Sequence, residues 1–440
     1  MSILQNLRNG SVPAPVRTAA KTEHVGAEHL ADLVQQGLAA VPANPNHTSF
    51  RRFSAIGKGL RTKVNANIGN SEVHPSPADE LEKLDAAVAA GADTVMDLST
   101  AGDIGALRRL VIERSPVAVG TVPAYEVAVR ARRDTGSTGR FTTEFLFEVV
   151  EEHAKDGADF MTLHCGVTRS VLAKLDTHPR VTNIVSRGGA LLARWMREND
   201  RENPLYENYD RLLDICRQYE VTISLGDGLR PGSLADAGDP AQYAELDVLG
   251  NLVLRAREAD VQTIVEGPGH VPLDQVEKQM QEAKRRTHDA PLYVLGPLVT
   301  DVGAGHDHVT AAIGGSLAAL HGADFLCYVT PREHLGLPTK DDVHKGVAAA
   351  RIAGHAADVA RGIPGAAEWD EKMSRARRAL DWDRQLGLAL DEKTARSYYE
   401  QAHTGDETDA CSMCGELCAF KNFADDDEDR PTARPPRCPV

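Results

Sequence analysis

The sequence lacks the features that would place the chain in a membrane, outside the cell or on a nucleic acid. No apolar run approaches the roughly 20 residues that a bilayer-spanning helix requires. The start, MSILQNLRNGSVPAPV, has neither the charged region nor the long apolar region of a secretory signal. Basic residues are outnumbered, 49 Lys and Arg against 64 Asp and Glu, and the formal net charge of −15 disfavours a nucleic-acid backbone as partner. These absences predict a cytoplasmic protein that binds neither membrane nor nucleic acid.

Cysteine is also scarce, with seven in the chain, yet three of them lie within the short stretch CSMCGELC. Thiols stay reduced in the cytoplasm, where clustered cysteines bind metal more often than they form disulfides. The spacing of Cys411, Cys414 and Cys418 is C-x2-C-x3-C, which fits two kinds of site. A structural zinc needs a fourth ligand, for which His403 and Cys438 are candidates. A 4Fe-4S cluster held by three thiolates instead leaves one iron free for a cofactor, and the spacing alone leaves both readings open.

Short apolar runs alternate with helix-like segments from about residue 60 to 335, which is typical of a parallel sheet covered by helices. The strand candidates are TKVNANIG, DTVMDLS, PVAVGTVP, DFMTLH, VTNIVS, VTISLGDG, VQTIVEGPG, LYVLGP and DFLCYVTP. Eight or nine such units favour an α/β fold of the (β/α)8 TIM-like barrel type over an open sheet, with one candidate left over. Cys165, Cys216 and Cys327 fall within or beside apolar segments, so we expect buried core thiols there.

The chain divides into four regions by pattern and composition. They are an N-terminal extension with some helix at 1–58, a catalytic barrel at 59–340, a C-terminal helical region at 341–403 and a cysteine-rich segment with an acidic, Pro-rich tail at 404–440. Within the helical region, apolar periodicity predicts long helices over 341–362 and 368–390 and a shorter one over 391–403.

Polar side chains gather where the strand candidates end. His164, Arg187, Arg230, His270 and His334 each follow a different candidate. A barrel places its chemistry at the C-terminal ends of its strands. A barrel built only for packing would need a turn and a helix cap at these positions, and neither requires histidine or arginine. Five such residues at one rim therefore predict a binding site.

The segment SRGG at 186–189 has the composition of an anion site. Ser186, Gly188 and Gly189 open a helix, where backbone N–H groups favour a negative charge. Arg187 adds a positive charge, and Arg230 can add a bidentate clamp. Together they predict a phosphate-bearing small molecule as ligand, and the alternative is a Gly-rich turn with exposed arginines.

A second constellation, EGPGH at 266–270, holds Glu266 and His270 on an irregular turn after a strand. His334 lies on the loop of a later strand, and neutral imidazole suits zinc or ferrous iron. Two histidines are too few for a closed structural zinc but fit an open metal site that water or a ligand completes. Histidines that stabilise loops by hydrogen bonds are the alternative.

The ordered motifs make a resemblance plain. NANIGNS, DTVMDLST, GTVP, VSRGG, SLGDGLRPGS, EGPGHVP, LGPLVTDVGAGHDH, CYVTPREHLGLP, HAADVARG and CSMCG resemble the phosphomethylpyrimidine synthase (ThiC) family from about residue 56 to 420. The resemblance implies a barrel, a helical region and a C-terminal iron–sulfur segment. It also implies a homodimer in which one subunit's cluster reaches the other subunit's barrel.

The activity that this resemblance implies is a radical S-adenosylmethionine lyase of thiamine biosynthesis. Such an enzyme rearranges 5-aminoimidazole ribonucleotide to 4-amino-5-hydroxymethyl-2-methylpyrimidine phosphate and releases formate and carbon monoxide. S-adenosylmethionine yields methionine and 5′-deoxyadenosine, and an external electron donor supplies an electron to the cluster.

The resemblance also implies a set of site residues. Its substrate contacts fall on Asn67, Met96, Tyr125, His164, Ser186, Arg187, Gly188, Asp227, Gly228, Leu229, Arg230, Glu266 and Tyr293. Glu266 is in addition the candidate catalytic residue, and His270 and His334 are the candidate ligands of a mononuclear zinc or iron ion. The cluster ligands fall on Cys411, Cys414 and Cys418. Hydrogen bonds from Asn67, Asp227 and Glu266 would hold the amine and ribose hydroxyls of the substrate.

Two departures bear on the subfamily. The common form of the family has C-x2-C-x4-C, one residue more than this chain in the second interval, and larger members carry an added N-terminal domain. A related branch makes 5-hydroxybenzimidazole from the same substrate and is the nearest alternative. A zinc-dependent barrel lyase or aldolase with a zinc-knuckle tail is the alternative from a different class.

Overall fold

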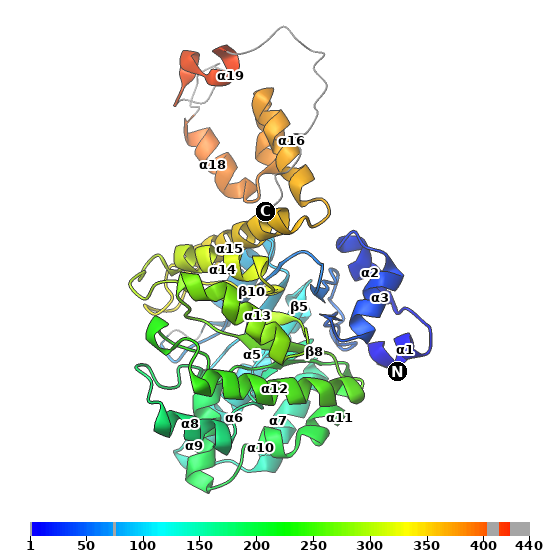
Figure 1. Ribbon diagram of the computed structural model, residues 1–440, viewed down its shortest axis with the longest axis vertical. Helices are drawn as coiled ribbons and strands as arrows, with labels where there is room; N and C mark the ends of the chain where they lie inside the picture. The colour runs from blue at the N-terminus through cyan, green and yellow to red at the C-terminus, as the bar shows by residue number, and fades with distance from the viewer. Residues whose placement is uncertain (1, 74–75, 403–412, 423–440) are drawn as a thin grey trace. The chain divides into compact units, whose positions relative to one another are not determined.

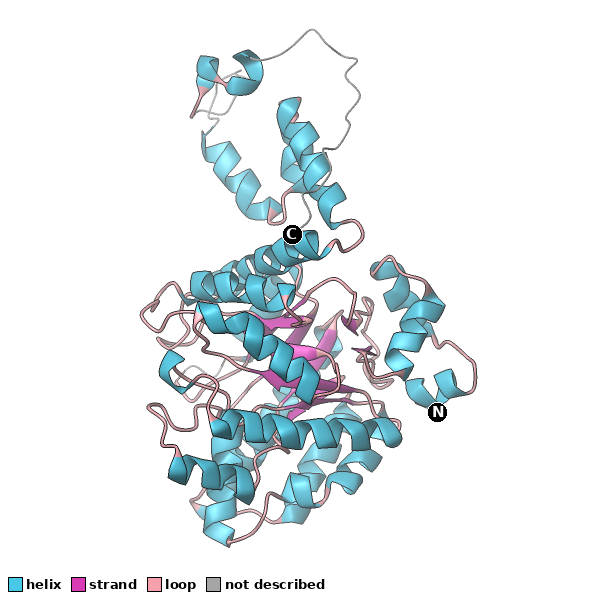
Figure 2. Ribbon diagram, in the orientation of Figure 1, coloured by secondary structure: helices cyan, strands magenta, loops and turns pink. Residues whose placement is uncertain are grey.

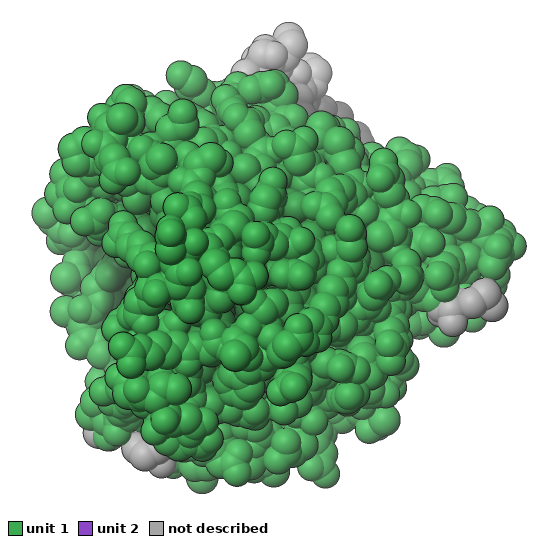
Figure 3. Space-filling view, turned by 90° about the horizontal axis from the view of Figure 1, so that it is seen from below, with its two compact units in different colours: residues 1–364 green, residues 365–440 purple. Residues whose placement is uncertain are grey.

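The computed structural model describes residues 2–73, 76–402 and 413–422. The chain forms two compact units, residues 1–364 and residues 365–440, and each is considered by itself. Figure 3 shows the surface of the first unit. Among the described residues, no helix is both long and apolar enough to cross a membrane.

Eight parallel strands close into a barrel in the order β10-β3-β4-β5-β6-β7-β8-β9, which confirms the predicted fold (Figure 2). The strands are β3 (Lys63–Ile68), β4 (Thr94–Asp97), β5 (Ala118–Thr121), β6 (Phe160–Leu163), β7 (Thr222–Leu225), β8 (Thr263–Gly267), β9 (Leu292–Leu295) and β10 (Phe325–Cys327). Nearly every strand residue is buried, because one face of the sheet points into the packed barrel interior and the helices cover the other face.

Helices follow the strands and form an outer layer around the barrel (Figure 1). They are α4 (Pro77–Ala89), α5 (Ile104–Arg114), α6 (Pro123–Thr135), α7 (Thr143–Asp156), α8 (Arg169–Thr177), α9 (Arg187–Asn199), α10 (Pro204–Glu207), α11 (Tyr209–Tyr219), α12 (Pro240–Glu258), α13 (Val276–Arg286), α14 (Asp307–Leu320) and α15 (Lys340–Arg361). The last of them, α15, packs against α14, α4 and β3 and completes the ring. The helix predicted over 341–362 therefore belongs to the barrel layer.

The lumen below the polar rim is filled by aromatic side chains. Tyr293 stacks on Phe325 with ring centroids 4.2 Å apart, and Phe160 meets Phe325 edge-on at 6.4 Å. Gly120 on β5 makes room for this layer, because a Cβ there would lie 2.3 Å from the Phe160 ring. The barrel is thus a packed core with one open end, as the fold type requires.

The N-terminal extension lies against the opposite end of the strands. It contains α1 (Ile3–Arg8), α2 (Ala14–Thr22), α3 (Ala27–Gln35) and the antiparallel pair β1 (Ala39–Ala40) and β2 (Ile56–Gly57). Backbone N–H groups of Val41 and Asn44 donate to Gln262 and Asp159, which immediately precede β8 and β6. Apolar residues of the extension and of the lumen form one hydrophobic cluster, so this segment covers the N-terminal mouth of the barrel.

One strand candidate, VTNIVS at 181–186, is wrong: the segment is a loop. Its backbone does not pair with a strand, because the N–H groups of Val181 and Thr182 donate to the Asp236 carboxylate at 2.8 and 2.9 Å. Asn183 has a φ of 57°, a left-handed conformation that a strand does not contain. This segment is the ninth candidate that the eight-stranded barrel leaves over.

The second unit is helical in its described part. It contains α16 (Ala366–Arg378), α17 (Trp382–Leu388), α18 (Glu392–Ala402), η3 (Gly415–Leu417) and α19 (Ala419–Asn422). The single helix predicted over 368–390 is therefore wrong, since it is divided between α16 and α17. The break lies at Leu380, whose φ is 53°, and Asp381 then caps α17 by accepting the Arg384 N–H at 3.0 Å.

Candidate active site

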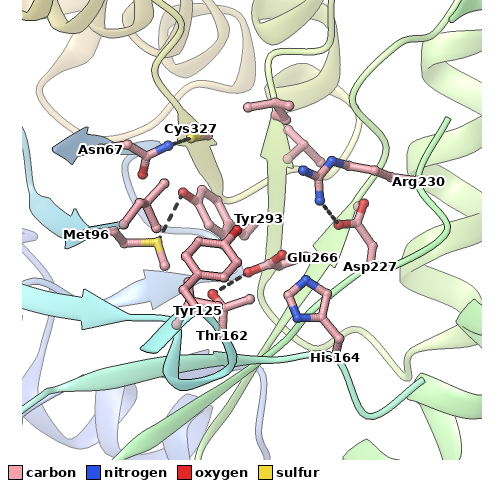
Figure 4. Close-up of a pocket in the computed structure, with 15 residues that line it drawn as sticks. Asn67, Met96, Tyr125, Thr162, His164, Asp227, Arg230, Glu266, Tyr293 and Cys327 are labelled. Atoms are coloured by element: carbon pink, nitrogen blue, oxygen red, sulfur yellow. Dashed lines mark hydrogen bonds and ion pairs between the residues drawn. The ribbon is translucent and has the colours of Figure 1, made fainter. Parts of the chain in front are cut away.

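A pocket of about 500 Å³, its open mouth included, lies at the C-terminal end of the barrel (Figure 4). Eight of the predicted substrate-binding residues line it: Asn67, Met96, Tyr125, His164, Asp227, Arg230, Glu266 and Tyr293. Strand register explains part of this convergence. Asn67 is paired with Met96 across β3 and β4, and Glu266 is paired with Tyr293 across β8 and β9. The pocket is lined by both polar and apolar side chains, as small-molecule pockets are.

Glu266 is held in a fixed orientation at the floor of the pocket. Its Oε1 accepts hydrogen bonds from the Thr162 hydroxyl at 2.7 Å and from the Ser224 hydroxyl at 2.9 Å. Burial raises the pKa of the Glu266 carboxyl above its ordinary value. The Asp227 backbone N–H is a further hydrogen-bond donor to this carboxylate. A carboxylate has about four acceptor sites, so Glu266 can still accept a hydrogen bond from a ligand.

Asp227 and Arg230 form a charged pair at the side of the pocket, with Arg230 Nη1 donating to Asp227 Oδ1 at 3.1 Å. The second oxygen, Oδ2, is buried and has no hydrogen-bond partner in the described structure. Burial, together with the nearby carboxylates Glu266 and Glu245, raises the pKa of Asp227 well above its ordinary value. A buried acceptor without a partner is costly, so this oxygen is a candidate contact for a ligand hydroxyl.

Glu245 stabilises the turn that carries this pair. The Glu245 carboxylate accepts the backbone N–H groups of Gly228 at 2.8 Å and Leu229 at 2.7 Å. Gly228 and Leu229 therefore do not line the pocket but fix the turn between Asp227 and Arg230. Burial raises the pKa of Glu245 to about 7.

His164 connects the pocket to the start of α9. Its Nε2 lies 3.0 Å from the Ser186 hydroxyl, and Ser186 caps α9 by accepting the Gly189 N–H at 3.2 Å. The predicted helix N-terminus is thus present, although a loop and not a strand leads into it. Gly188 is required sterically, because a Cβ there would lie 2.1 Å from the His164 ring.

His164 also makes a testable contribution to stability. Burial, and secondarily the Arg230 charge, lowers the pKa of His164 from 6.5 to about 3. Below pH 6.5 the unfolded chain therefore binds a proton that the folded chain does not, and stability is lost as the pH falls. We expect His164→Gln to remove about 2 kcal/mol of the loss of unfolding free energy between pH 7 and pH 5. Urea unfolding at the two pH values measures this.

The exposed His178 provides the matched control, since His178→Gln removes an imidazole at the surface end of α8. That variant should keep the pH dependence of the wild type. An equal pH dependence for His164→Gln and the wild type would contradict the assignment of a buried, neutral His164.

The opposite wall of the pocket contains Asn67, Met96, Tyr293 and Cys327. Asn67 Nδ2 donates to Cys327 Sγ at 3.1 Å, and the Tyr293 hydroxyl lies 3.8 Å from Met96 Sδ (Figure 4). Burial raises the pKa of Cys327 to about 11, so the thiol is protonated at neutral pH. The prediction of a buried thiol is confirmed for Cys327, but this thiol also faces the pocket.

A second pocket of about 930 Å³, open mouth included, adjoins the first and shares Asn67 and Leu98 with it. Arg187 lines this second pocket, and its guanidinium carbon lies 4.9 Å from the centre of the Tyr125 ring. His334 also lines it. The two pockets thus meet at Asn67 and Leu98.

The two candidate metal ligands face each other at the rim. The ring centroids of His270 and His334 are 5.5 Å apart, inclined at 50°. Two imidazoles that bind one tetrahedral ion at about 2.0–2.1 Å have centroids about 5 Å apart, so the pair fits a shared ion. Among the described residues, no group of three or more His, Cys, Asp or Glu residues forms a metal site. His270 and His334 are thus two candidate ligands, and the described chain adds no third.

His334 has a backbone conformation that is uncommon for a residue other than glycine. Its φ is 62°, and its side chain is 54% exposed. Left-handed residues of this kind cluster at functional sites, where the surrounding structure holds them in place. The conformation turns His334 toward His270.

Two of the three candidate cluster ligands lie in the described part of the second unit. Cys414 is exposed and Cys418 is buried, and the turn η3 lies between them. Leu417 N–H donates to Cys414 O at 2.9 Å, which closes this turn. Cys411 lies outside the described residues, as do the alternative zinc ligands His403 and Cys438.

Several residues of the site were not among those predicted from the sequence. Thr162 and Ser224 orient Glu266, Glu245 holds the 227–230 turn, and Cys327 faces the pocket. Thr162 could have been found, because it lies two positions before His164 and therefore on the same face of β6. Glu245 lies on α12, far along the chain from the motif it supports, and no local signal marks it.

The fold and the site define an α/β-barrel enzyme with a buried, charged small-molecule pocket at the C-terminal ends of its strands. The chain belongs to the Radical SAM ThiC family, whose model matches residues 2–425. Membership of this family implies S-adenosylmethionine and a 4Fe-4S cluster as cofactors.

Curated relatives are similar over almost the whole chain. The chain is 57% identical to the phosphomethylpyrimidine synthase of Moorella thermoacetica, over 96% of this chain and 97% of that protein. It is 55% identical to the phosphomethylpyrimidine synthase of Desulforamulus reducens, over 95% and 96% respectively. A solved dihydropteroate synthase from Xanthomonas albilineans matches 74% of this chain and all of that chain at 12% identity, with a TM-score of 0.42, which is too distant to carry an argument.

Proposed function

We propose that this protein is a phosphomethylpyrimidine synthase. It would rearrange 5-aminoimidazole ribonucleotide to 4-amino-5-hydroxymethyl-2-methylpyrimidine phosphate by radical S-adenosylmethionine chemistry. The observation that carries the proposal is the pocket in which Glu266, Asp227 and Arg230 converge on one open volume at the barrel mouth. Membership of the family fixes the reaction class, and the identity with the named synthases favours this product.

The polar groups of the pocket match the parts of such a substrate. The Glu266 carboxylate and Asp227 Oδ2 can accept hydrogen bonds from the ring amine and the ribose hydroxyls. The phosphate would bind near the N-terminus of α9, where Arg187 and Arg230 supply positive charge. Gly188 and Gly228 allow the backbone of both turns to approach His164 and Glu245 closely.

The apolar wall has a different role. Met96, Tyr125 and Tyr293 are each less than 10% exposed and would cover the faces of the substrate ring. A reactive radical must be kept from water, and a closed apolar wall excludes it. The protein would thus position and shield the substrate, while the cofactor supplies the radical.

The remaining partners are those that the family resemblance implies. Cys414 and Cys418, with Cys411, would hold the cluster, and the pocket that shares Asn67 and Leu98 with the first has room for S-adenosylmethionine. His270 and His334 would hold a divalent zinc or iron ion with open coordination positions. We further propose a homodimer in which one subunit's cluster serves the other subunit's pocket, with an external electron donor.

The test is an anaerobic incubation of the reconstituted protein with 5-aminoimidazole ribonucleotide, S-adenosylmethionine and a reductant, followed by mass spectrometry. We expect the pyrimidine phosphate together with 5′-deoxyadenosine and methionine. Formation of 5-hydroxybenzimidazole without the pyrimidine would assign the chain to the related branch. A colourless protein without iron after anaerobic purification would instead favour a zinc-dependent lyase.

A further inference from the structure

The imidazole of His270 is oriented by Asp301, a carboxylate of the LGPLVTDVGAGHDH segment that is not among the predicted site residues. His270 Nδ1 lies 2.8 Å from Asp301 Oδ1, and Asp301 lies in the segment between β9 and α14. An ionised carboxylate only accepts hydrogen bonds, so the neutral form of His270 carries its proton on Nδ1 and its lone pair on Nε2. The His270 side chain is 9% exposed and Asp301 is 38% exposed, so the carboxylate reaches the ring from the solvent side.

The other oxygen of the same carboxylate reaches the substrate loop. Asp301 Oδ2 accepts the Leu234 N–H at 2.9 Å, and the His270 N–H donates to Pro231 O at 3.3 Å. Leu234 and Pro231 continue the turn that carries Asp227 and Arg230. One carboxylate therefore ties the candidate metal ligand to the loop that lines the substrate pocket.

The second histidine has a similar arrangement. His334 Nδ1 lies 3.5 Å from Asp307 Oδ2, an ion-pair distance rather than a hydrogen bond, and Asp307 is the first residue of α14. Both imidazoles thus direct Nδ1 toward a carboxylate from the same stretch of chain. This leaves the Nε2 atoms as the nitrogens available to a shared ion.

We propose that Asp301 is the positioning residue of the metal site. It fixes His270 with Nε2 unprotonated, and it holds the 227–234 loop at a fixed position relative to the metal. This inference rests on the proposed metal at His270 and His334. Carboxylates that bind the far nitrogen of a metal-ligating histidine fix its tautomer and orientation, and their loss weakens metal binding.

The variant Asp301→Asn separates the two bonds. Its amide oxygen can still accept the Leu234 N–H, which leaves the amide NH2 facing His270 Nδ1. The imidazole must then accept at Nδ1 and carry its proton on Nε2, the nitrogen that would bind the metal. The loop is therefore kept while the tautomer is reversed.

The measurement is the affinity of the metal-stripped full-length protein for Co²⁺, followed by its visible absorption, and for Zn²⁺ in competition with a chromogenic chelator. We expect Asp301→Asn to raise the dissociation constant about 10- to 100-fold. Substrate affinity in the metal-free protein should be unchanged, because the loop bond is preserved. The control Asp274→Asn neutralises an exposed carboxylate on the same loop as His270 and should bind Co²⁺ as the wild type does.

The variants His270→Ala and His334→Ala distinguish the two possible failures. If they lose the metal but Asp301→Asn binds it as tightly as the wild type does, the positioning role is wrong and the metal site stands. If neither alanine variant weakens binding, the metal site itself is wrong, and the role of Asp301 falls with it.

Discussion

Replacing Glu266 with glutamine should lower kcat/KM for the ribonucleotide about 100-fold, a loss that either a missing hydrogen bond to a charged group or a missing proton transfer can produce. Glutamine keeps an oxygen for the hydroxyls of Thr162 and Ser224, so the side chain stays in place. Its NH2 group replaces the other carboxylate oxygen, so a donor takes the place of an acceptor that the substrate amine would need. Anaerobic steady-state kinetics on the reconstituted enzyme measure the change.

The pH profile of this variant adds a second readout. Burial raises the pKa of the Glu266 carboxyl, so the activity that needs the carboxylate should rise with pH at a value above the ordinary 4.5. Asp227 is close enough for its titration to be coupled to that of Glu266. The fall in activity at low pH therefore reflects both carboxyls. Glu266→Gln should remove the Glu266 contribution from that fall.

Glu258→Gln, at the exposed end of α12, is the matched control for Glu266→Gln, since it makes the same chemical change outside the pocket. It should leave kcat/KM within experimental error of the wild type. Wild-type kcat/KM in Glu266→Gln would show that the carboxylate has no part in the reaction.

Replacing Cys414 with alanine should abolish the cleavage of S-adenosylmethionine. Two thiolates cannot hold a cubane cluster in which three are needed, so the iron content should fall well below about four per chain. The barrel is a separate compact unit, residues 1–364, and should remain folded. Iron and sulfide analysis, 5′-deoxyadenosine formation and equilibrium binding of the ribonucleotide measure the three effects.

The neighbouring Met413 provides the control for this cysteine. Its side chain is 91% exposed, so Met413→Ala changes the same turn without removing a thiol. That variant should keep its iron. Normal cleavage of S-adenosylmethionine by Cys414→Ala would show that the cluster ligands lie elsewhere.

Local sequence patterns are sufficient to predict most elements of the barrel. Periodicity predicts the eight barrel strands and the helix α15, because fully buried parallel strands and amphipathic helices leave different apolar patterns. The same pattern gives a wrong prediction at 181–186, where the predicted strand is a loop. That run is apolar and short enough for a strand, but the Asp236 carboxylate on a later segment takes its N–H groups.

The site shows a similar division. The polar rim residues His164, Arg230 and His270 could be predicted because histidine and arginine at strand ends have no packing role. Met96, Tyr125 and Tyr293 could not be predicted from their local sequence, since a residue that lines a lumen looks like a core residue. Only the resemblance of the motifs indicated them.

The sequence by itself determined the order of the barrel units and their number to within one strand candidate. It also determined the turns that carry the polar residues and the spacing of the cysteines, because these features depend on neighbours along the chain. The tertiary structure decided which of those residues meet. Closing the barrel sets the register that places Asn67 beside Met96 and Glu266 beside Tyr293. It also brings Asp301 to His270, a contact across 31 residues that depends on two loops folding over the same rim.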